Sequence, residues 1–387
     1  MKPKIFFTAI ITSLILFLSC QDNAHKENTF RKIAYDIDTL NISVDSTSEN
    51  FYFTFHNFYK NSNEFIAYYN GHRHSIDIAN LDNQKLENII SLDKEGENAV
   101  IRPTSIFIIS SDSIWIYSNY TQALKLIDAH GRVLKSYNLS NIKTVQGNVG
   151  DLLADYNFPL QYDKHTGNLF FYNIYSGDIP KSIASNVVAT FNIRSAKLSL
   201  LPLGYSDYYI SEKGEFGNFW NASLSIVDNK LIYNFQAESG IYTSDLLGNS
   251  QSSYKADSKF TKNQVSPYRA NEDGERHGIE NPTFFRVLYD PYRNLYYRFH
   301  WGGIPHKDIN GRINTFSDKP LFLMVLDENF NVLHEMKMPE QTYAVYTWFV
   351  SSKGLCINSG NAILKNANQE EGKMVIHIYK FKVKNSS

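Results

Sequence analysis

The chain has 387 residues, of which 38 are basic and 39 acidic, and its formal net charge is −1 at pH 7. Because no basic stripe runs along it, we do not expect nucleic acid as a partner. Aromatic residues make up 14% of the chain, and its 26 Tyr and 26 Phe favour β-strands over helices. The length exceeds that of an ordinary single core, so the sequence predicts either two domains or a repeat architecture that grows by adding units.

The N-terminus resembles a bacterial lipoprotein signal peptide. Lys2 and Lys4 precede an apolar run at residues 5–18 that is too short to span a bilayer, and Ser19 and Cys20 follow this run. The resemblance implies cleavage before Cys20 and attachment of a lipid to its sulfur. A plain secretory signal or an anchoring helix is the alternative.

The expected domain organisation follows from this signal. Residues 1–19 form the signal peptide, residues 20–29 a polar lipidated tether, residues 30–383 one β-propeller domain and residues 384–387 a tail. Gln21 rather than Asp follows Cys20, which by resemblance to lipoprotein sorting signals favours the outer membrane of the cell envelope. Whether the domain faces the periplasm or the medium stays open. Cys356, the other cysteine, lies in an apolar stretch and is expected to be a buried, inert thiol.

A repeated hairpin is the main structural signal in the rest of the chain. Each copy is an apolar strand that ends in Asp or Asn, followed by a tight turn and a returning strand. The copies lie at residues 75–92, 123–139, 187–203, 241–248 and 321–338. Two further strands precede each hairpin, as at residues 105–117 and 283–299.

Four antiparallel strands in every ~40 to 65 residues predict an all-β fold, a six-bladed β-propeller. The last blade ends after three strands at residues 374–383, and residues 31–37 form an unassigned strand ahead of the first blade. Joining these two segments would close the ring and remove two open sheet edges. A seven-bladed propeller or a two-domain β protein is the alternative. The inner strands are expected to begin near Phe51, Thr104, Phe158, Ala222, Thr283 and Val345.

Three segments also carry a family resemblance. They are residues 94–100 (KEGENAV), residues 112–117 (DSIWIY) with 126–128 (LID), and residues 289–298 (YDPYRNLYYR). With these motifs the chain resembles, over roughly residues 30–383, the Bacteroidota lipoprotein family catalogued as domain of unknown function 4221. The resemblance implies a six-bladed propeller-like fold and a cell-envelope setting, and it implies no activity and no functional residues.

The connections between strands differ in length, and this difference locates a candidate site. Long connections span residues 139–158, 204–222, 256–282, 300–319 and 358–373, and they are expected on one face of the propeller. Flat aromatic side chains there can stack on sugar rings or grip a peptide, with packing inside the propeller as the alternative. The candidate ligand-binding residues of this long-loop face are Tyr208, Trp220, Trp301, His72, His74 and His306.

Two polar groups in the sequence are further candidates for binding. His72, His74, His300 and His306 offer imidazoles to a metal ion, but their spacing matches no defined zinc motif. No metal and no other cofactor is therefore expected. A basic group can bind an anionic ligand or can form ion pairs inside the blades; it consists of Arg269, Arg286, Arg293 and Arg298.

The sequence lacks the common enzyme signatures. Neither a GxSxG nucleophile motif nor a phosphate-binding GK[ST] loop nor an HExxH zinc motif is present. We therefore expect an envelope module that binds a glycan, a peptide or an envelope protein. An envelope lyase or hydrolase is the alternative, because isolated Asp, Glu and Tyr residues can converge in a fold.

Replacing Cys20 tests the anchor. A diacylglycerol and an amide-linked acyl chain together would supply the several chains that stable anchoring needs. We expect Cys20→Ala to move the protein from the membrane fraction to the soluble fraction of its host. Continued partitioning of the variant with membranes would place the anchor elsewhere.

Overall fold

The computed structural model describes residues 32–384, except residues 49–50, 141, 145–146, 176–178, 214, 270, 362 and 369. The predicted signal peptide, Cys20 and the tether lie outside the described residues. Among the residues described, no helix is both long and apolar enough to cross a membrane.

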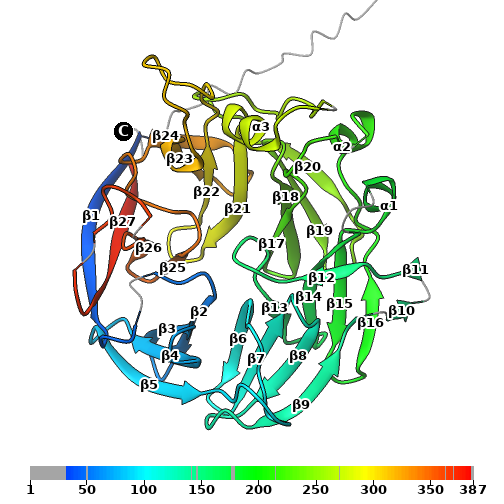
Figure 1. The fold of residues 1–387 in the computed structure, drawn as a ribbon, viewed down its shortest axis with the longest axis vertical. Coiled ribbons are helices and arrows are strands. Elements are labelled where there is room, and N and C mark those ends of the chain that lie inside the picture. Colours follow the sequence, from blue (N-terminus) through cyan, green and yellow to red (C-terminus); the bar gives the residue numbers. More distant parts are fainter. Residues whose placement is uncertain are drawn as a thin grey trace, which may run out of the picture.

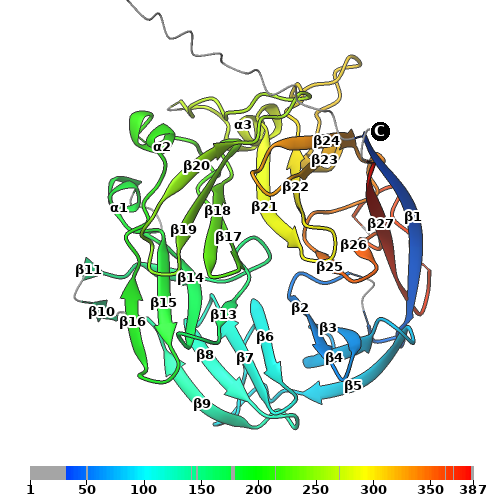
Figure 2. The ribbon, with the colours of Figure 1, turned by 180° about the vertical axis from the view of Figure 1, so that it is seen from behind.

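The fold is all-β, and its antiparallel sheets are arranged around a common centre (Figures 1 and 2). Three sheets have four strands in chain order, with the first strand nearest the centre and the last at the rim (Figure 1). They are β6 (Ser105–Ser110), β7 (Ser113–Ser118), β8 (Ala123–Ile127) and β9 (Val133–Asn138); β17 (Ala222–Val227), β18 (Lys230–Phe235), β19 (Gly240–Asp245) and β20 (Ser252–Lys255); and β21 (Thr283–Asp290), β22 (Leu295–Trp301), β23 (Leu321–Leu326) and β24 (Val332–Lys337).

A fourth sheet has five strands, because β14 pairs with two short strands along the same edge. It contains β12 (Asp151–Leu153), β13 (Gln161–Asp163), β14 (Asn168–Ile174), β15 (Val188–Asn192) and β16 (Lys197–Leu200). The small elements between sheets are the hairpin of β10 (Lys143–Thr144) and β11 (Gly147–Asn148) and the helices α2 (Asp207–Ser211) and α3 (Gly274–Glu280). Within sheets, helix α1 (Ile179–Ala184) connects β14 to β15, and the 3-10 helix η1 (Phe316–Asp318) connects β22 to β23.

The remaining eight strands form one sheet with two four-stranded halves. One half runs through β2 (Phe55–Lys60), β3 (Asn63–Asn70), β4 (Ser75–Asn80) and β5 (Lys85–Ser91), and the other through β25 (Trp348–Ser351), β26 (Gly354–Asn358), β27 (Lys373–Lys384) and β1 (Lys32–Ser43). β1 pairs antiparallel with β27 from Lys32↔Lys384 to Ser43↔Lys373. The halves meet in one parallel pair, Ser43↔Lys85. The N-terminal strand thus pairs with the C-terminal strand, and it is longer than the predicted residues 31–37.

The predicted hairpins are confirmed, and three of them share one turn geometry. Oδ1 of Asp128, Asp245 and Asp327 accepts hydrogen bonds from the backbone N–H groups two and four residues later, at 2.8–3.0 Å. The residue three positions after each Asp has a positive φ, +80° at Gly131, +82° at Gly248 and +61° at Phe330. Glycine reaches this conformation without steric cost, whereas Phe330 is held there with its ring buried.

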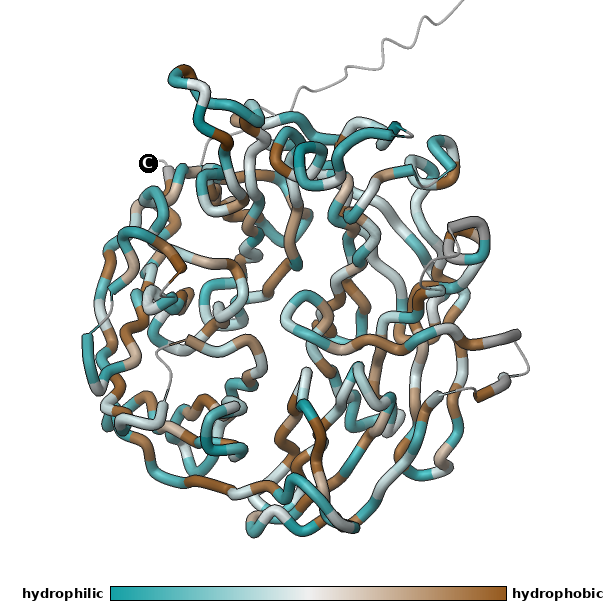
Figure 3. Tube along the Cα trace, in the orientation of Figure 1, coloured by the Kyte–Doolittle hydropathy of each residue, from teal (hydrophilic) through white to brown (hydrophobic). Residues whose placement is uncertain are grey.

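Apolar clusters join each sheet to the next. Hydrophobic residues recur along the strands (Figure 3), and each large cluster combines two neighbouring sheets. One cluster contains Ile66 and Tyr68 from β3 together with Phe349 from β25 and Ile376 from β27, so the first and last sheet halves also pack on each other. Cys356 lies in this cluster, where burial raises the pKa of its thiol to about 12. The prediction of a buried thiol is confirmed, and its raised pKa agrees with low reactivity.

Removing β1 tests how much the fold depends on the pairing of its termini. A chain that starts at residue 44 loses the buried side chains of Leu40 and Ile42 and leaves β27 with an open edge. We expect this chain to aggregate, while a chain that starts at residue 30 melts as the full-length protein without its signal does. Thermal melting and size-exclusion chromatography compare the two. Equal melting temperatures would show that β1 is dispensable.

Candidate functional site

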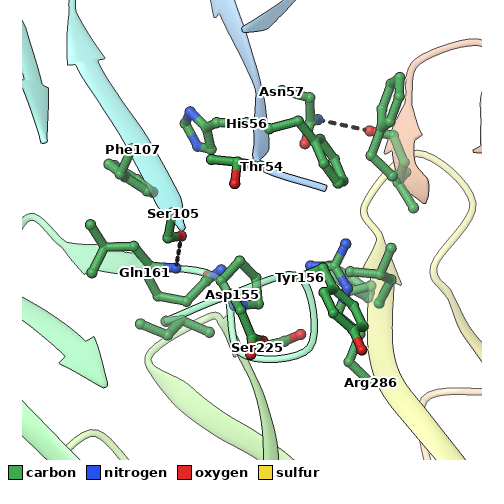
Figure 4. A pocket seen from close by; sticks show the side chains of 18 of the residues that line it. Thr54, His56, Asn57, Ser105, Phe107, Asp155, Tyr156, Gln161, Ser225 and Arg286 are labelled. Carbon is green, nitrogen blue, oxygen red and sulfur yellow. Dashed lines mark hydrogen bonds between the residues drawn. The ribbon is translucent and has the colours of Figure 1, made fainter. Parts of the chain in front are cut away.

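A cavity of about 330 Å³ lies at the centre of the structure, between the first strands of the sheets. Figure 4 shows its polar lining, which consists of side chains from several separate strands and from the loop before β13. The labelled residues come from β2 (His56, Asn57), β6 (Ser105, Phe107), β13 (Gln161), β17 (Ser225), β21 (Arg286) and the segments that precede β2 and β13 (Thr54, Asp155, Tyr156).

Arg286 is the cationic group of this cavity. The residue is only 6% exposed, and its Nη2 donates to the backbone oxygen of Trp348 at 2.8 Å. Its guanidinium also lies 5.3 Å from the centre of the Trp348 ring. Burial lowers the pKa of Arg286 to about 10, so the side chain stays charged at neutral pH. The buried Nε has no hydrogen-bond partner among the described residues.

Asp155 is the anionic group, and it sits at the end of the long connection that leads to β13. Its Oδ1 accepts hydrogen bonds from the backbone N–H groups of Asn157 (2.8 Å) and Phe158 (3.2 Å), which fixes the loop. Burial raises the pKa of Asp155, while these two hydrogen bonds and the charge of Arg286 oppose the shift. Asp155 and Arg286 therefore attract each other, yet they form no ion pair within 4.0 Å.

His56 is a neutral hydrogen-bond donor to the cavity. The backbone N–H of Ile108 donates to its Nδ1 at 3.1 Å, so the proton of the neutral ring is on Nε2. Burial lowers the pKa of His56 to about 4, which keeps the ring uncharged at neutral pH. The nearby Gln161 amide makes no side-chain hydrogen bond within the described part of the chain. By contrast, the hydroxyl of Ser225 donates to the backbone oxygen of Val287 at 2.6 Å.

Aromatic residues border the cavity at both ends. On the side of the short turns, the hydroxyl groups of Tyr59 and Tyr292 contact each other, and Tyr59 donates to Glu64 Oε1 at 2.8 Å. On the side of the long connections, the ring of Tyr346 lies 5.1 Å from that of Phe53 and 4.7 Å from that of Tyr156. The cavity thus combines charged and neutral polar groups with aromatic borders, a combination typical of sites for small polar ligands.

The aromatic residues predicted as a site on the 204–222 connection serve mainly in packing. The hydroxyl of Tyr208 donates to the backbone oxygen of Val265 at 2.6 Å, and Trp220 stands edge-on to Tyr205 at 5.8 Å. Both are partly buried against the cluster between the five-stranded sheet of β12–β16 and the sheet of β17–β20. Neither residue lines the central cavity.

Trp301 lies in a different place, a second cavity of about 260 Å³. Its ring stands edge-on to Phe285 at 5.0 Å, and the Nζ of Lys319 lies 5.5 Å from its centre. Tyr346 lines this cavity and also contacts the aromatic border of the central one. Trp301 is therefore partly open to a ligand but belongs to another pocket.

The predicted histidines do not come together. His74 is 6% exposed and is held by the Tyr69 hydroxyl (2.8 Å) and the backbone oxygen of Asp93 (3.2 Å), while His72 beside it is exposed. His306 lies on the connection after β22, where its backbone N–H donates to Glu280 Oε1 at 3.4 Å. Within the described ranges, no group of three or more His, Cys, Asp or Glu side chains could hold a metal ion.

The four arginines also separate. Arg293 forms an ion pair with Asp290 at 2.9 Å, and Arg298, fully buried, donates to the backbone oxygens of Ser239 and Glu238. Arg269 is exposed on the surface. Only Arg286 of this group lines the central cavity. Sequence reasoning missed Asp155, His56 and Gln161; the start of each first strand was the available signal, but it does not reveal which side chains point inward.

Arg286 and Arg298 make a matched pair for testing whether the cavity is kept for a ligand. Arg298→Met would strip two buried backbone oxygens of their partner, and we expect it to lower the free energy of unfolding by about 2 to 4 kcal/mol. Arg286→Met removes a poorly paired buried charge and one hydrogen bond, so we expect a change within about 1 kcal/mol. Denaturant unfolding measures both. An equal loss at the two positions would make Arg286 a structural residue.

Comparisons with known proteins agree with the fold. The family model described as "Domain of unknown function (DUF4221)" matches residues 31–337. The crystal structure of a member of this family from Bacteroides vulgatus is 20% identical, covers 92% of this chain and 99% of its own, and superposes with a TM-score of 0.77. A Bacteroides fragilis protein thought to be exported is 9% identical, covers 90% of this chain and 95% of its own, and superposes with a TM-score of 0.54.

A search of curated proteins finds no match. The two solved structures are too distant in sequence to show more than a shared fold. The family model, by contrast, spans well over half of the chain, and it includes the three segments that carried the resemblance. The chain therefore belongs to the DUF4221 family.

Proposed function

We propose that the chain is a lipid-anchored envelope protein whose six-bladed propeller binds a small polar ligand in its central cavity. The pairing of β1 with β27 supports six blades, because it turns the eight-stranded sheet into two four-stranded blades. Among the described residues, the strand pairing between these halves is the single pair Ser43↔Lys85, far less than the ladder within either half. On this assignment β1 is the outer strand that closes the ring.

An envelope location rests on the N-terminal sequence and on one relative. Lys2, Lys4, the apolar run and Cys20 have the order of a lipoprotein signal, and the similar Bacteroides fragilis protein is thought to be exported. Gln21 favours the outer membrane. The anchor would be a lipid on Cys20, joined to β1 by the tether at residues 20–29.

The direction of β1 gives the orientation of such an anchored domain. Lys32 pairs with Lys384, at the end of β27 opposite its start at Lys373, where the connection at residues 358–373 enters. The tether would therefore join the domain at its short-turn end. The long connections, with Asp155, Tyr156 and Trp301, would point away from the lipid.

Arg286 is the observation that carries the binding function. A charged side chain that is 6% exposed normally has an ionic partner, because burial of an unpaired charge costs free energy. Among the described residues, Arg286 has one backbone acceptor and no partner for its Nε, and it borders a cavity large enough for a small molecule. A ligand group that accepts hydrogen bonds would complete its environment.

The alternative is an envelope lyase or hydrolase that uses the same cavity or the long-loop face. Asp155 and His56 are groups of the kind that transfer protons in such enzymes. The binding function has the stronger support, since the hydrogen bond from Ile108 and the low pKa of His56 make its Nε2 a donor rather than a base. A turnover assay against glycans and peptides separates the two functions.

Filling the cavity tests the proposed location of binding. Gln161→Trp adds bulk at a half-buried position. The side-chain amide of Gln161 makes no hydrogen bond within the described residues, so its loss breaks none there. We expect ligands found in a thermal-shift screen of sugars, carboxylates, phosphates and amino compounds to stabilise the wild type and not this variant. Trp301→Ala, in the second cavity, serves as the control and should retain the shift. Equal shifts in wild type and Gln161→Trp would place binding elsewhere.

A further inference from the structure

The central cavity contains two opposite charges that do not satisfy each other. Arg286 comes from β21 and Asp155 from the loop before β13, so two separate parts of the chain deliver them (Figure 4). Both line the same cavity, and the charge of each opposes the effect of burial on the pKa of the other. No guanidinium nitrogen of Arg286 lies within 4.0 Å of a carboxylate oxygen of Asp155, so the two side chains form no ion pair. Direct pairing of these groups would have been the usual way to stabilise both charges.

Each charge has unused hydrogen-bonding capacity. A guanidinium has five N–H donors, and for Arg286 one hydrogen bond is formed and the buried Nε is unpaired within the described residues. On Asp155, Oδ1 accepts both backbone hydrogen bonds, and Oδ2 accepts none from the described residues. The loop is thus fixed by one carboxylate oxygen while the other stays available.

We propose that the cavity binds a small zwitterion, with its carboxylate on Arg286 and its ammonium group on Asp155. This inference rests on the proposed function, since it names the ligand class of the same cavity. A guanidinium binds a carboxylate through two parallel hydrogen bonds, and a carboxylate is the natural partner of an ammonium. A ligand that carries both charges leaves the net charge of the cavity unchanged and pairs both charged groups.

The neighbouring groups fit this ligand class. Tyr156 lines the same cavity as Asp155, and an aromatic ring in such a cavity can contact an ammonium group. His56 Nε2 and the Gln161 amide offer neutral hydrogen bonds to the rest of the ligand. The volume of about 330 Å³ suits a free amino acid or a short peptide, which share the two charged groups.

Titration calorimetry with two variants tests the proposal. Asp155→Asn keeps an Oδ1 acceptor for the N–H groups of Asn157 and Phe158 and removes only the charge. Arg286→Gln removes the cation. Asp245→Asn is the matched control, because Oδ1 of Asp245 accepts the same kind of turn hydrogen bonds away from the cavity. The probes are a mixture of free amino acids, a mixture of di- and tripeptides, propionate, ethylamine and a neutral disaccharide.

We expect a zwitterionic probe to bind wild type and the control equally and at least tenfold more tightly than propionate or ethylamine. Each cavity variant should weaken this binding at least tenfold. The two zwitterion mixtures distinguish a free amino acid from a peptide as the source of the ligand.

Four results would overturn the zwitterion. In the first, propionate binds as tightly as the zwitterions and Asp155→Asn does not change its affinity. In the second, only the disaccharide binds. Either result would leave the central cavity as a binding site for another ligand class. A zwitterion that binds with unchanged affinity to both cavity variants would refute the assigned contacts. If no probe bound and the broader screen also gave no shift, the proposed binding function would fail as well.

Discussion

Packing between neighbouring sheets is the interaction on which the rest of the structure depends. A four-stranded sheet in this chain has apolar side chains on both faces, so it is stable only between two neighbours. Most of these contacts join segments that follow each other in the chain. The cluster of Ile66, Tyr68, Phe349 and Ile376 instead joins residues about 300 positions apart, and β1 adds a ladder to β27. The entropic cost of closing a loop grows only slowly with its length, so this long-range contact costs little more free energy than a contact between adjacent sheets.

The arrangement around a centre also produces the cavity. First strands approach the middle from several sheets, and their inner edges have no further strand to pair with. Side chains such as Asn57, Gln161 and Arg286 are therefore brought together although they lie far apart in the sequence. Burial of Arg286 and Asp155 there lowers stability compared with an apolar lining. A polar interior with an incompletely paired guanidinium agrees with the proposal that the centre holds a ligand.

The long connections divide between packing and the cavity. The connection at residues 204–222 buries Tyr205, Tyr209, Phe216 and Phe219 between two sheets, so most of its aromatic surface is used inside the protein. The connection at residues 139–158 instead ends in Asp155 at the centre. Composition alone cannot separate these two uses, because an aromatic side chain lowers its free energy equally well by packing in a core or by covering a ligand.

The sequence by itself determined the strands, the hairpins with their Asp turns and the family, because these depend on local patterns of alternation and turn chemistry. The predicted starts at Ala222 and Thr283 coincide with the starts of β17 and β21. The sequence also predicted the N-terminal strand, but not its extent to Ser43. Only the tertiary structure decided which side chains meet at the centre. Arg286 was one of four arginines with similar surroundings in the sequence, and Asp155 was one acidic residue in a long loop. Their approach depends on the relative orientation of separate sheets, which is set by packing between neighbouring sheets throughout the fold and has no local signature.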